Sequence, residues 1–452
     1  MFKFGGSSLA SAENLSRVAD IIAGYADPLV VVTSALGGVT DLLTTEITRG
    51  ESRRELGLRL RGLHLDLAAE LDLPAQVLAD FTAHLDTTLA DLDSLDAGNR
   101  SHHDLALSIG ERLSTNLMAA VLSGRGTRAV YIDSRPLIRT DSNWGQARVD
   151  LETTRTKVNT QLQPLLAKGA VLIVTGFLGS NHCGETTTIG RNGSDLTATV
   201  LGACFQSREV WIWTDVDGIF TADPRHYDGA RLLTEISYRE AAEAAYFGAT
   251  VIHPHTLWPL LETETAVRIV NTLHPSSPGT LICRRPKERG DNLITTAVDQ
   301  VSVVTVGGYG MVGVPGIAAT IFSAVQTVGA SVLMISQSSS EHNISFVIRD
   351  KDVERTVEAL DRVLGDWIRL DHRIDRIQVM PDVSIVTVVG EDMKGRCGIA
   401  GKIFSALGQE EISVIAIAQG SSEYSISMAL PSHQTRQAIS AIHSRLDAGH
   451  DG

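Results

Sequence analysis

Three short segments place glycines or small polar residues beside charged side chains, a pattern suited to binding charged small molecules. The first is KFGGSS at residues 3–8. Its glycines allow backbone amides to approach a phosphate closely while Lys3 supplies positive charge. An ordinary glycine turn with an exposed lysine would have the same sequence. The segment is not a P-loop, because G-x-x-x-x-G-K-[ST] does not occur: Gly401-Lys402 is followed by Ile403.

The second segment is TTTIGRNGSD at residues 186–195, directly before a helical pattern. Ser194 or Asp195 is suited to cap that helix. Arg191 is able to hold a carboxylate through paired hydrogen bonds, and Asp195 is able to receive an ammonium group. The alternative is a capped loop with a solvated arginine.

The third segment, WIWTDVDGIF at residues 211–220, begins as a strand and ends in an acidic turn, followed by TADPR. Loops beyond the carboxyl ends of strands are where α/β sheets bind ligands. Carboxylates there can position a nucleotide ribose or its metal ion. Asp-Gly turns also arise for purely conformational reasons.

Two further motifs resemble known binding motifs, but their sequences argue against a dinucleotide site and a metal site. GYGMVG at 308–313 matches G-x-G-x-x-G, but a related segment later in the chain has Asp392 at the middle glycine, and neither is followed by an acidic residue at the expected distance. We therefore reject a dinucleotide site. His253-Pro254-His255 has no third ligand nearby, so we interpret it as a proline-bounded loop and predict no metal-ligating residues.

Alternating elements should position these loops. Short β-rich runs at 28–34, 169–179 and 208–218 alternate with helical patterns, which predicts a parallel or mixed sheet flanked by helices. The stretch from 42 to 96 has helical spacing and predicts two or three surface helices. Pro, Gly, Ser and charge cluster at 274–292, where we place a domain boundary.

The C-terminal part contains an internal repeat. Residues 302–348 align without a gap on 384–430, and about half of the aligned positions are identical. Each copy has the pattern strand, Gly-rich loop, helix, strand, polar turn, strand. Two such units, each with a sheet edge, are expected to dock on each other or on a second subunit. The loops and turns suit the charged ends of a free amino acid, and the candidate residues are Gly313, Gly316, Ile317, Gln337, Gly395, Gly398, Ile399 and Gln419.

Bulk properties narrow the function classes. The 452 residues are enough for two or three domains, and a formal charge of −14 argues against nucleic-acid or acidic-membrane partners. No apolar stretch is long enough to span a membrane, and the N-terminus has no leader pattern. The four cysteines stand far apart without a C-x-x-C pair, as expected for reduced thiols in a cytoplasmic protein.

These motifs, with SALGGVTDLL at 34–43, SIGERLST at 108–115 and the tandem repeat, resemble aspartate kinases over essentially the whole chain. The polar turns look most like the kinase half of the bifunctional aspartate kinase/homoserine dehydrogenases, here without the dehydrogenase and so monofunctional. The resemblance implies an amino-acid-kinase, carbamate-kinase-like three-layer α/β sandwich at 1–285. Two ferredoxin-like α+β ACT domains would follow at 295–375 and 376–452.

The resemblance also implies residue roles. Aspartate would be bound by Ser34, Thr40, Glu111, Arg191, Gly193, Ser194 and Asp195. ATP, with its Mg²⁺, would be bound by Lys3, Gly5, Gly6, Ser7, Thr214, Asp215, Phe220, Asp223 and Arg225. The catalytic set would be Lys3, Arg191 and Asp195. We expect no general base, because the attacking carboxylate is already ionised at pH 7.

Two positions depart from the family pattern: Phe220 replaces a tyrosine near the nucleotide, and Thr250 replaces a phosphate-facing lysine. Another basic residue is needed if that charge is to be restored. The turns at Gln337 and Gln419 resemble those of threonine-responsive members, so we favour threonine over lysine as the effector. A homodimer is expected through the ACT edges. The alternatives are another amino-acid kinase, for glutamate or acetylglutamate, and a catalytically weak amino-acid sensor.

Overall fold

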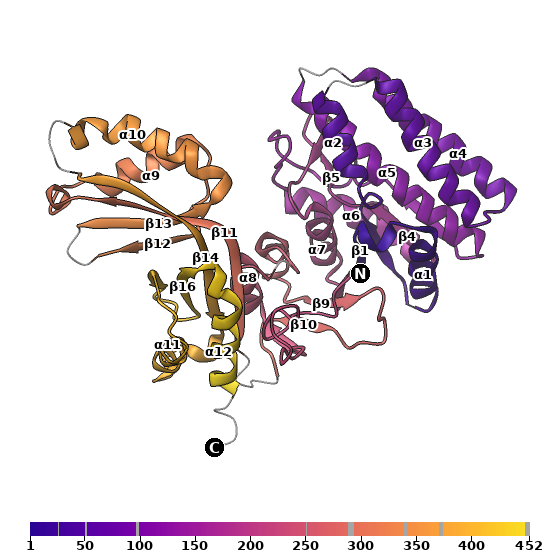
Figure 1. The fold of residues 1–452 in the computed structure, drawn as a ribbon. Coiled ribbons are helices and arrows are strands. Elements are labelled where there is room, and N and C mark those ends of the chain that lie inside the picture. The colour runs from indigo at the N-terminus through magenta and orange to yellow at the C-terminus, as the bar shows by residue number, and fades with distance from the viewer. Residues whose placement is uncertain are drawn as a thin grey trace. The chain divides into compact units, whose positions relative to one another are not determined.

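The protein forms two compact units in a computed structural model (Figure 1). The structure describes residues 1–25, 27–49, 52–95, 99–249, 251–287, 293–338, 342–369 and 374–447. The first unit comprises 1–219, 232–238 and 251–287, and the second comprises 220–231, 239–250 and 288–452. The predicted domain boundaries stay predictions. No helix of the described residues is both long and apolar enough to cross a membrane.

An eight-stranded sheet forms the centre of the first unit, in the order β3-β4-β2-β1-β7-β9-β10-β8. From β3 to β9 all neighbours are parallel; β10 is antiparallel to β9 and parallel to β8. The three β-rich runs of the sequence become β2, β4 and β7, as predicted. The strands are β1 Phe2–Phe4, β2 Val30–Thr33, β3 Ala129–Ile132, β4 Val171–Thr175, β7 Glu209–Thr214, β8 Glu235–Ser237, β9 Ala266–Asn271 and β10 Thr280–Cys283.

Helices cover both faces of this sheet. Phe2 and Phe4 of β1 pack into a core with α1 and α5, whereas the intervening Lys3 reaches Asp195 of α7. Since successive strand residues point to opposite faces, the layers are helix, sheet and helix, which confirms the predicted sandwich. The helices are α1 Ala12–Ala23, α2 Val39–Arg49, α3 Arg53–Glu70, α4 Ala75–Leu89, α5 Arg100–Gly124, α6 Leu151–Leu166 and α7 Gly193–Phe205. The predicted surface helices at 42–96 are confirmed as α2, α3 and α4.

A small antiparallel hairpin, β5 Leu178–Ser180 and β6 Thr186–Thr188, follows β4 and leads into α7. Strand β6 ends at Thr188, so the segment 190–195, which leads into α7, follows directly after this hairpin.

The second unit contains a six-stranded antiparallel sheet in the order β12-β13-β11-β14-β16-β15. The long strands β11 and β14 pair along most of their length, so each contributes to both repeats (Figure 1). The two copies thus dock on each other through one continuous sheet, with the predicted order of elements. The elements are β11 Ile294–Gly307, β12 Met334–Gln337, β13 Asn343–Arg349, β14 Arg376–Val389, β15 Ala416–Gln419, β16 Ser425–Pro431, α9 Ile317–Thr327, α10 Val353–Arg369, α11 Ile399–Gln409 and α12 Thr435–Asp447.

Helix α8, Tyr238–Tyr246, packs on the second repeat. Arg239 donates to the Tyr424 hydroxyl at 2.8 Å, and Glu240 Oε1 accepts from the Glu391 amide at 3.0 Å. The close approach of Gly248 to the Ala297 carbonyl leaves no room for a Cβ, so the chain passes directly against β11 there.

Candidate functional site

Parallel strands β4, β2, β1, β7 and β9 end at one edge of the first unit's sheet, and the segments that follow them are tied together by backbone hydrogen bonds. Gly176 N donates to Thr33 O at 2.9 Å, Ser34 N to Phe4 O at 3.2 Å, and Thr272 N to Thr214 O at 2.8 Å. This edge is where α/β sheets bind ligands. It brings the glycine-rich segment 3–8, the segment 34–43 and the acidic turn at 214–218 side by side.

Lys3 and Asp195 form a buried ion pair at this edge. Lys3 Nζ lies 2.6 Å from Asp195 Oδ1, and the two side chains are 11% and 8% exposed. Asn192 Nδ2 donates to the other carboxylate oxygen at 3.3 Å, with Asn192 in the left-handed conformation that begins α7. The structure thus unites two predicted catalytic residues that are far apart in the sequence.

Two glycines let the start of α7 lie directly against the end of β4. A Cβ on Gly176 would lie 2.6 Å from Ser194 Oγ, and one on Gly193 would collide with the Phe177 ring. Phe177 N also donates to Thr197 Oγ1 at 2.9 Å. This packing fixes the first turn of α7, so the predicted residues Gly193, Ser194 and Asp195 are held at the edge of the sheet.

Glu111 on α5 is a second buried carboxylate, with different partners. The Ala35 amide hydrogen-bonds it, but Oε2 has no hydrogen-bond partner in the part of the chain that the structure describes. Burial raises the pKa of Glu111 to about 8, although the Ala35 hydrogen bond acts in the opposite direction. The side chain is therefore mainly protonated at neutral pH.

The segment after β2 packs against α5 beside Glu111. A Cβ on Gly110 would lie 3.1 Å from Val39 Cγ1, so α5 and the first turn of α2 are in close contact. Ser114 Oγ donates to the Ser34 carbonyl at 2.5 Å. These contacts hold Ser34 against α5 beside Glu111, and Thr40, in the first turn of α2, is half-buried.

Asp104, which the sequence did not single out, joins α5 to the segment before α7. It is 1% exposed, and its Oδ2 accepts from Gly145 N at 2.9 Å and Thr188 N at 2.7 Å. Burial raises its pKa, partly opposed by those hydrogen bonds. Nothing in the local sequence distinguishes this aspartate from a solvated one, because its donors are distant in the chain.

Arg191 lies outside this buried cluster. Its side chain is exposed, and it forms no ion pair with another described residue. Its charge does act on His253: the pKa of His253 is lowered by burial, by His255 and by Arg191. The structure thus places Arg191 near the His253 loop, where it remains accessible to a ligand.

The residues predicted for ATP fall in both units. In the first unit, a Cβ on Gly6 would lie 3.0 Å from the Ala35 carbonyl, and Thr214 Oγ1 donates to Asp215 Oδ1 at 3.1 Å. Gly5 N donates to Trp213 O at 3.4 Å, and Ser7 is exposed.

In the second unit, Arg225 forms a two-pronged ion pair with Asp223, with Arg225 Nη2 at 2.7 Å from Asp223 Oδ2. This contact lowers the pKa of Asp223. Phe220 is half-buried in the same segment. Thr250, at the position of the missing lysine, lies outside the described residues.

A polar cluster at the ends of β7 and β9 was also missed. Asp217 Oδ1 accepts from Asn271 Nδ2 at 2.7 Å and from His274 Nδ1 at 2.9 Å. The His274 hydrogen bond is the largest of the causes that lower the pKa of Asp217. Ser8 Oγ and Thr272 Oγ1 lie 2.8 Å apart and join this cluster to the glycine-rich segment. In the described part of the chain, no three His, Cys, Asp or Glu side chains are grouped to hold a metal ion.

The candidate effector loops have nearly identical backbones in the two repeats. Gly313 and Gly395 both have φ 69°, and Gly316 and Gly398 both have φ 90°, a left-handed conformation that favours glycine. Ile317 and Ile399 begin α9 and α11 and are buried, whereas Gln337 and Gln419 end β12 and β15 and are exposed. The rest of the first polar turn, 339–341, lies outside the described residues.

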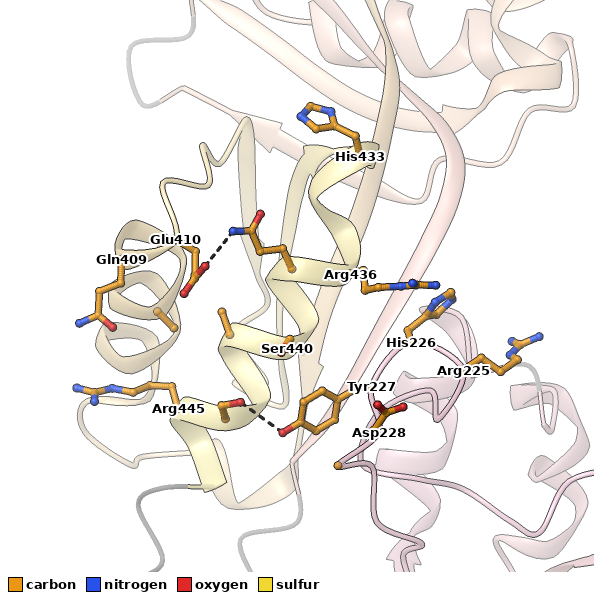
Figure 2. Close-up of a pocket in the computed structure, with 15 residues that line it drawn as sticks. Arg225, His226, Tyr227, Asp228, Gln409, Glu410, His433, Arg436, Ser440 and Arg445 are labelled. Atoms are coloured by element: carbon orange, nitrogen blue, oxygen red, sulfur yellow. Dashed lines mark hydrogen bonds between the residues drawn. The ribbon is translucent and has the colours of Figure 1, made fainter.

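The second unit also contains a polar groove of about 930 Å³, which lies between the segment 225–229 and helices α11 and α12 (Figure 2). Gln437 donates to Glu410 at 2.9 Å across it, and Tyr227 and Ser444 hydroxyls lie 3.3 Å apart. None of the predicted effector residues lines this groove, so the effector prediction rests on the two loops instead.

Comparison with known proteins completes the description of the chain. Residues 2–271 match the amino acid kinase family, and 304–364 and 386–446 match an ACT domain. A bifunctional aspartokinase/homoserine dehydrogenase of Haemophilus influenzae is 36% identical over 466 residues, covering 99% of this chain and 56% of that protein. The chain spans about half the length of the bifunctional relatives it matches.

Two full-length matches come from Escherichia coli. Lysine-sensitive aspartokinase 3 is 30% identical over 450 residues, which cover 98% of each chain. The crystal structure of aspartokinase III in complex with aspartate and ADP has a TM-score of 0.80 and 29% identity, with 99% of each chain covered.

Proposed function

The chain belongs to the aspartokinases of the amino acid kinase family, and we propose that it transfers the terminal phosphoryl group of ATP to the side-chain carboxylate of L-aspartate, giving 4-phospho-L-aspartate. The observation that carries this proposal is the buried Lys3–Asp195 pair, 2.6 Å apart, beside the glycines at the edge of the sheet. A lysine held there can neutralise charge on the transferred group, which is the main requirement of phosphoryl transfer.

The two buried carboxylates suit the ammonium group of the substrate. Asp195 and Glu111 lie on α7 and α5 at the edge where the parallel strands end. The exposed Arg191 is available for a carboxylate, and Ser34, Thr40, Gly193 and Ser194 complete the proposed aspartate set. The attacking carboxylate is ionised at neutral pH and needs no general base.

The residues at the ends of β1 and β7 fit a nucleotide. Since a Cβ on Gly6 would press on the Ala35 carbonyl, glycine keeps the backbone open for a phosphate there. We propose that Gly5, Gly6 and Ser7, with Thr214 and Asp215, hold ATP. Phe220, Asp223 and Arg225 are the remaining proposed nucleotide residues. Mg²⁺ would enter with ATP, because it is commonly bound by phosphates and one or two carboxylates.

The tandem ACT repeats support regulation by a free amino acid. We propose that it binds at the glycine loops and at Gln337 and Gln419, with threonine favoured over lysine; the E. coli relative is named for lysine sensitivity. Inhibition requires that the effector bind the less active conformation more tightly. Exposed Ile335 and Ile417 on the edge strands β12 and β15 suit pairing with a second copy, and we expect a cytoplasmic homodimer.

The test is ATP-dependent formation of aspartyl hydroxamate by the purified chain with Mg²⁺, with and without threonine or lysine. Turnover on aspartate, little on glutamate or acetylglutamate, and suppression by threonine are expected. Folded protein that binds threonine or lysine without any turnover would overturn the kinase proposal in favour of an amino-acid sensor. Suppression by lysine alone would reverse the effector assignment and leave the reaction intact.

A further inference from the structure

His274 stands at the same edge of the sheet as the proposed nucleotide segments. It follows β9, which is parallel to β7 with Asn271 level with Thr214, and β7 is parallel to β1 with Trp213 level with Phe4. In the segments that follow these three strands, at 5–11, 215–219 and 272–279, His274 is the one basic side chain. Lys3, within β1, is a second basic side chain at this edge.

The two basic side chains differ in what holds them. Lys3 is already paired with Asp195 at 2.6 Å and is almost fully buried. His274 is 66% exposed, and its Nδ1 hydrogen donates to Asp217 Oδ1 at 2.9 Å. The structure gives Nε2 no hydrogen-bond partner among the described residues, so this nitrogen is accessible to a ligand.

Asp217 is itself held in place. Asn271 Nδ2 donates to Asp217 Oδ1 at 2.7 Å and to the Asp215 carbonyl at 3.4 Å, while Asn271 Oδ1 accepts from Leu273 N at 2.8 Å. This network fixes the imidazole through Nδ1, much as a carboxylate orients a histidine in metal and catalytic sites. Such an arrangement presents Nε2 outward without the entropy loss of ordering a free side chain on binding.

We propose that His274 contacts the phosphate chain of ATP through Nε2, with Asp217 and Asn271 as positioning residues. This inference rests on the proposed nucleotide site at β1 and β7. Two strand spacings separate β1 from β9, about 10 Å, a span that an extended triphosphate chain and its ribose cross. His274 would then supply the basic contact for the chain that Thr250, in place of lysine, does not provide.

The test measures ADP binding by calorimetry, without aspartate, for the wild type and His274→Asn. Asparagine retains a donor to Asp217 but has no group at the position of Nε2. Loss of a hydrogen bond to a charged phosphate is expected to weaken binding about tenfold.

Two further variants distinguish the loss of a His274 contact with ADP from a general effect on folding. Asp217→Asn keeps the shape but releases the imidazole, and it should weaken ADP binding less than His274→Asn does. His182→Asn, an exposed histidine in the turn between β5 and β6, should change nothing. An ADP dissociation constant of His274→Asn within twofold of the wild type would overturn the inference. Because no turnover is measured, failure of the aspartate assignment would leave this result interpretable.

Discussion

The proposed aspartate site has buried Glu111 on its α5 side and buried Asp195 on its α7 side, and among the described residues only Asp195 has a cation as partner. Asp195 is paired with Lys3 at 2.6 Å and also accepts from Asn192. Glu111 accepts from the Ala35 amide, forms no ion pair with a described residue, and has its pKa raised to about 8 by burial. Two carboxylates proposed for one ligand therefore begin with different partners.

This difference indicates separate roles for the two carboxylates in the proposed reaction. Asp195 is paired with Lys3 before the substrate arrives, so its proposed role includes orienting Lys3 for the proposed phosphoryl transfer. The α5 side holds a proton that an incoming ammonium group can displace, because an adjacent positive charge favours the ionised form. The first side should thus control rate and stability, and the second should control aspartate affinity and its pH dependence.

The largest expected effect is on stability. Asp195→Asn leaves Lys3 buried without an anion, which should lower the free energy of unfolding by about 3–5 kcal/mol. The double variant Lys3→Met/Asp195→Leu should recover most of that loss, because an apolar pair of similar volume often replaces a buried ion pair without penalty. Glu111→Gln should not lower the free energy of unfolding at pH 7, because the amide resembles the uncharged carboxyl group that burial favours.

Urea denaturation of the four proteins measures this contrast. A loss below about 1 kcal/mol for Asp195→Asn would mean that solvent reaches Lys3, and the two sides would then not differ in the way described.

The second effect is on catalysis. Lys3→Met removes the charge proposed for the transferred phosphoryl group, and kcat should fall by about 10²–10³, as for the loss of one transition-state donor. Glu111→Gln should mainly raise the KM for aspartate and leave kcat within a few-fold. Steady-state hydroxamate assays at saturating ATP separate the two. Equal losses of kcat in both variants would show that the two sides act as one unit.

Sequence motifs and the family resemblance singled out the proposed members of this site but not their pairing. Lys3, Glu111 and Asp195 lie in glycine-containing motifs that can be recognised locally. That Lys3 meets Asp195 depends on the parallel pairing of β1 and on the approach of α7 to Gly176. That Glu111 has no cation partner among the described residues depends on its burial where α2 packs against α5. Neither follows from local spacing, since both are set by segments distant in the chain.

Other functional candidates had no local signal at all. Asp104 gains its role from amides at Gly145 and Thr188, across two other elements. His274 lies in the stretch 274–292, where we predicted a domain boundary from composition, and the first part of this stretch follows the end of β9 and precedes strand β10. The composition of a segment indicates its tendency to form turns, but it does not indicate which strand the segment follows in the fold.

The third effect is the pH dependence of stability. Folding raises the pKa of Glu111 from 4.5 to about 8, so the folded state keeps a proton that the unfolded state loses. The contribution of Glu111 to stability should be greatest near or below pH 4.5 and fall as the pH approaches 8, by up to about 1.4 kcal/mol per pH unit. Glu111→Gln should lack this slope and exceed the wild type in stability at pH 8. Glu13→Gln, an exposed control, should follow the wild type; parallel curves for all three proteins would contradict the raised pKa.

The smallest expected effect is the release of a proton when aspartate binds. It tests the difference between Glu111 and Asp195 most directly. At pH 7 Glu111 is mainly protonated, and binding of the ammonium group should ionise it, so close to one proton should leave per aspartate bound. Calorimetry in buffers of different ionisation enthalpy measures this number. Glu111→Gln should release none, whereas Asp195→Asn should still release the proton despite weaker binding. A buffer-independent heat for the wild type would place the ammonium group away from α5 and leave the α7 side as its sole partner.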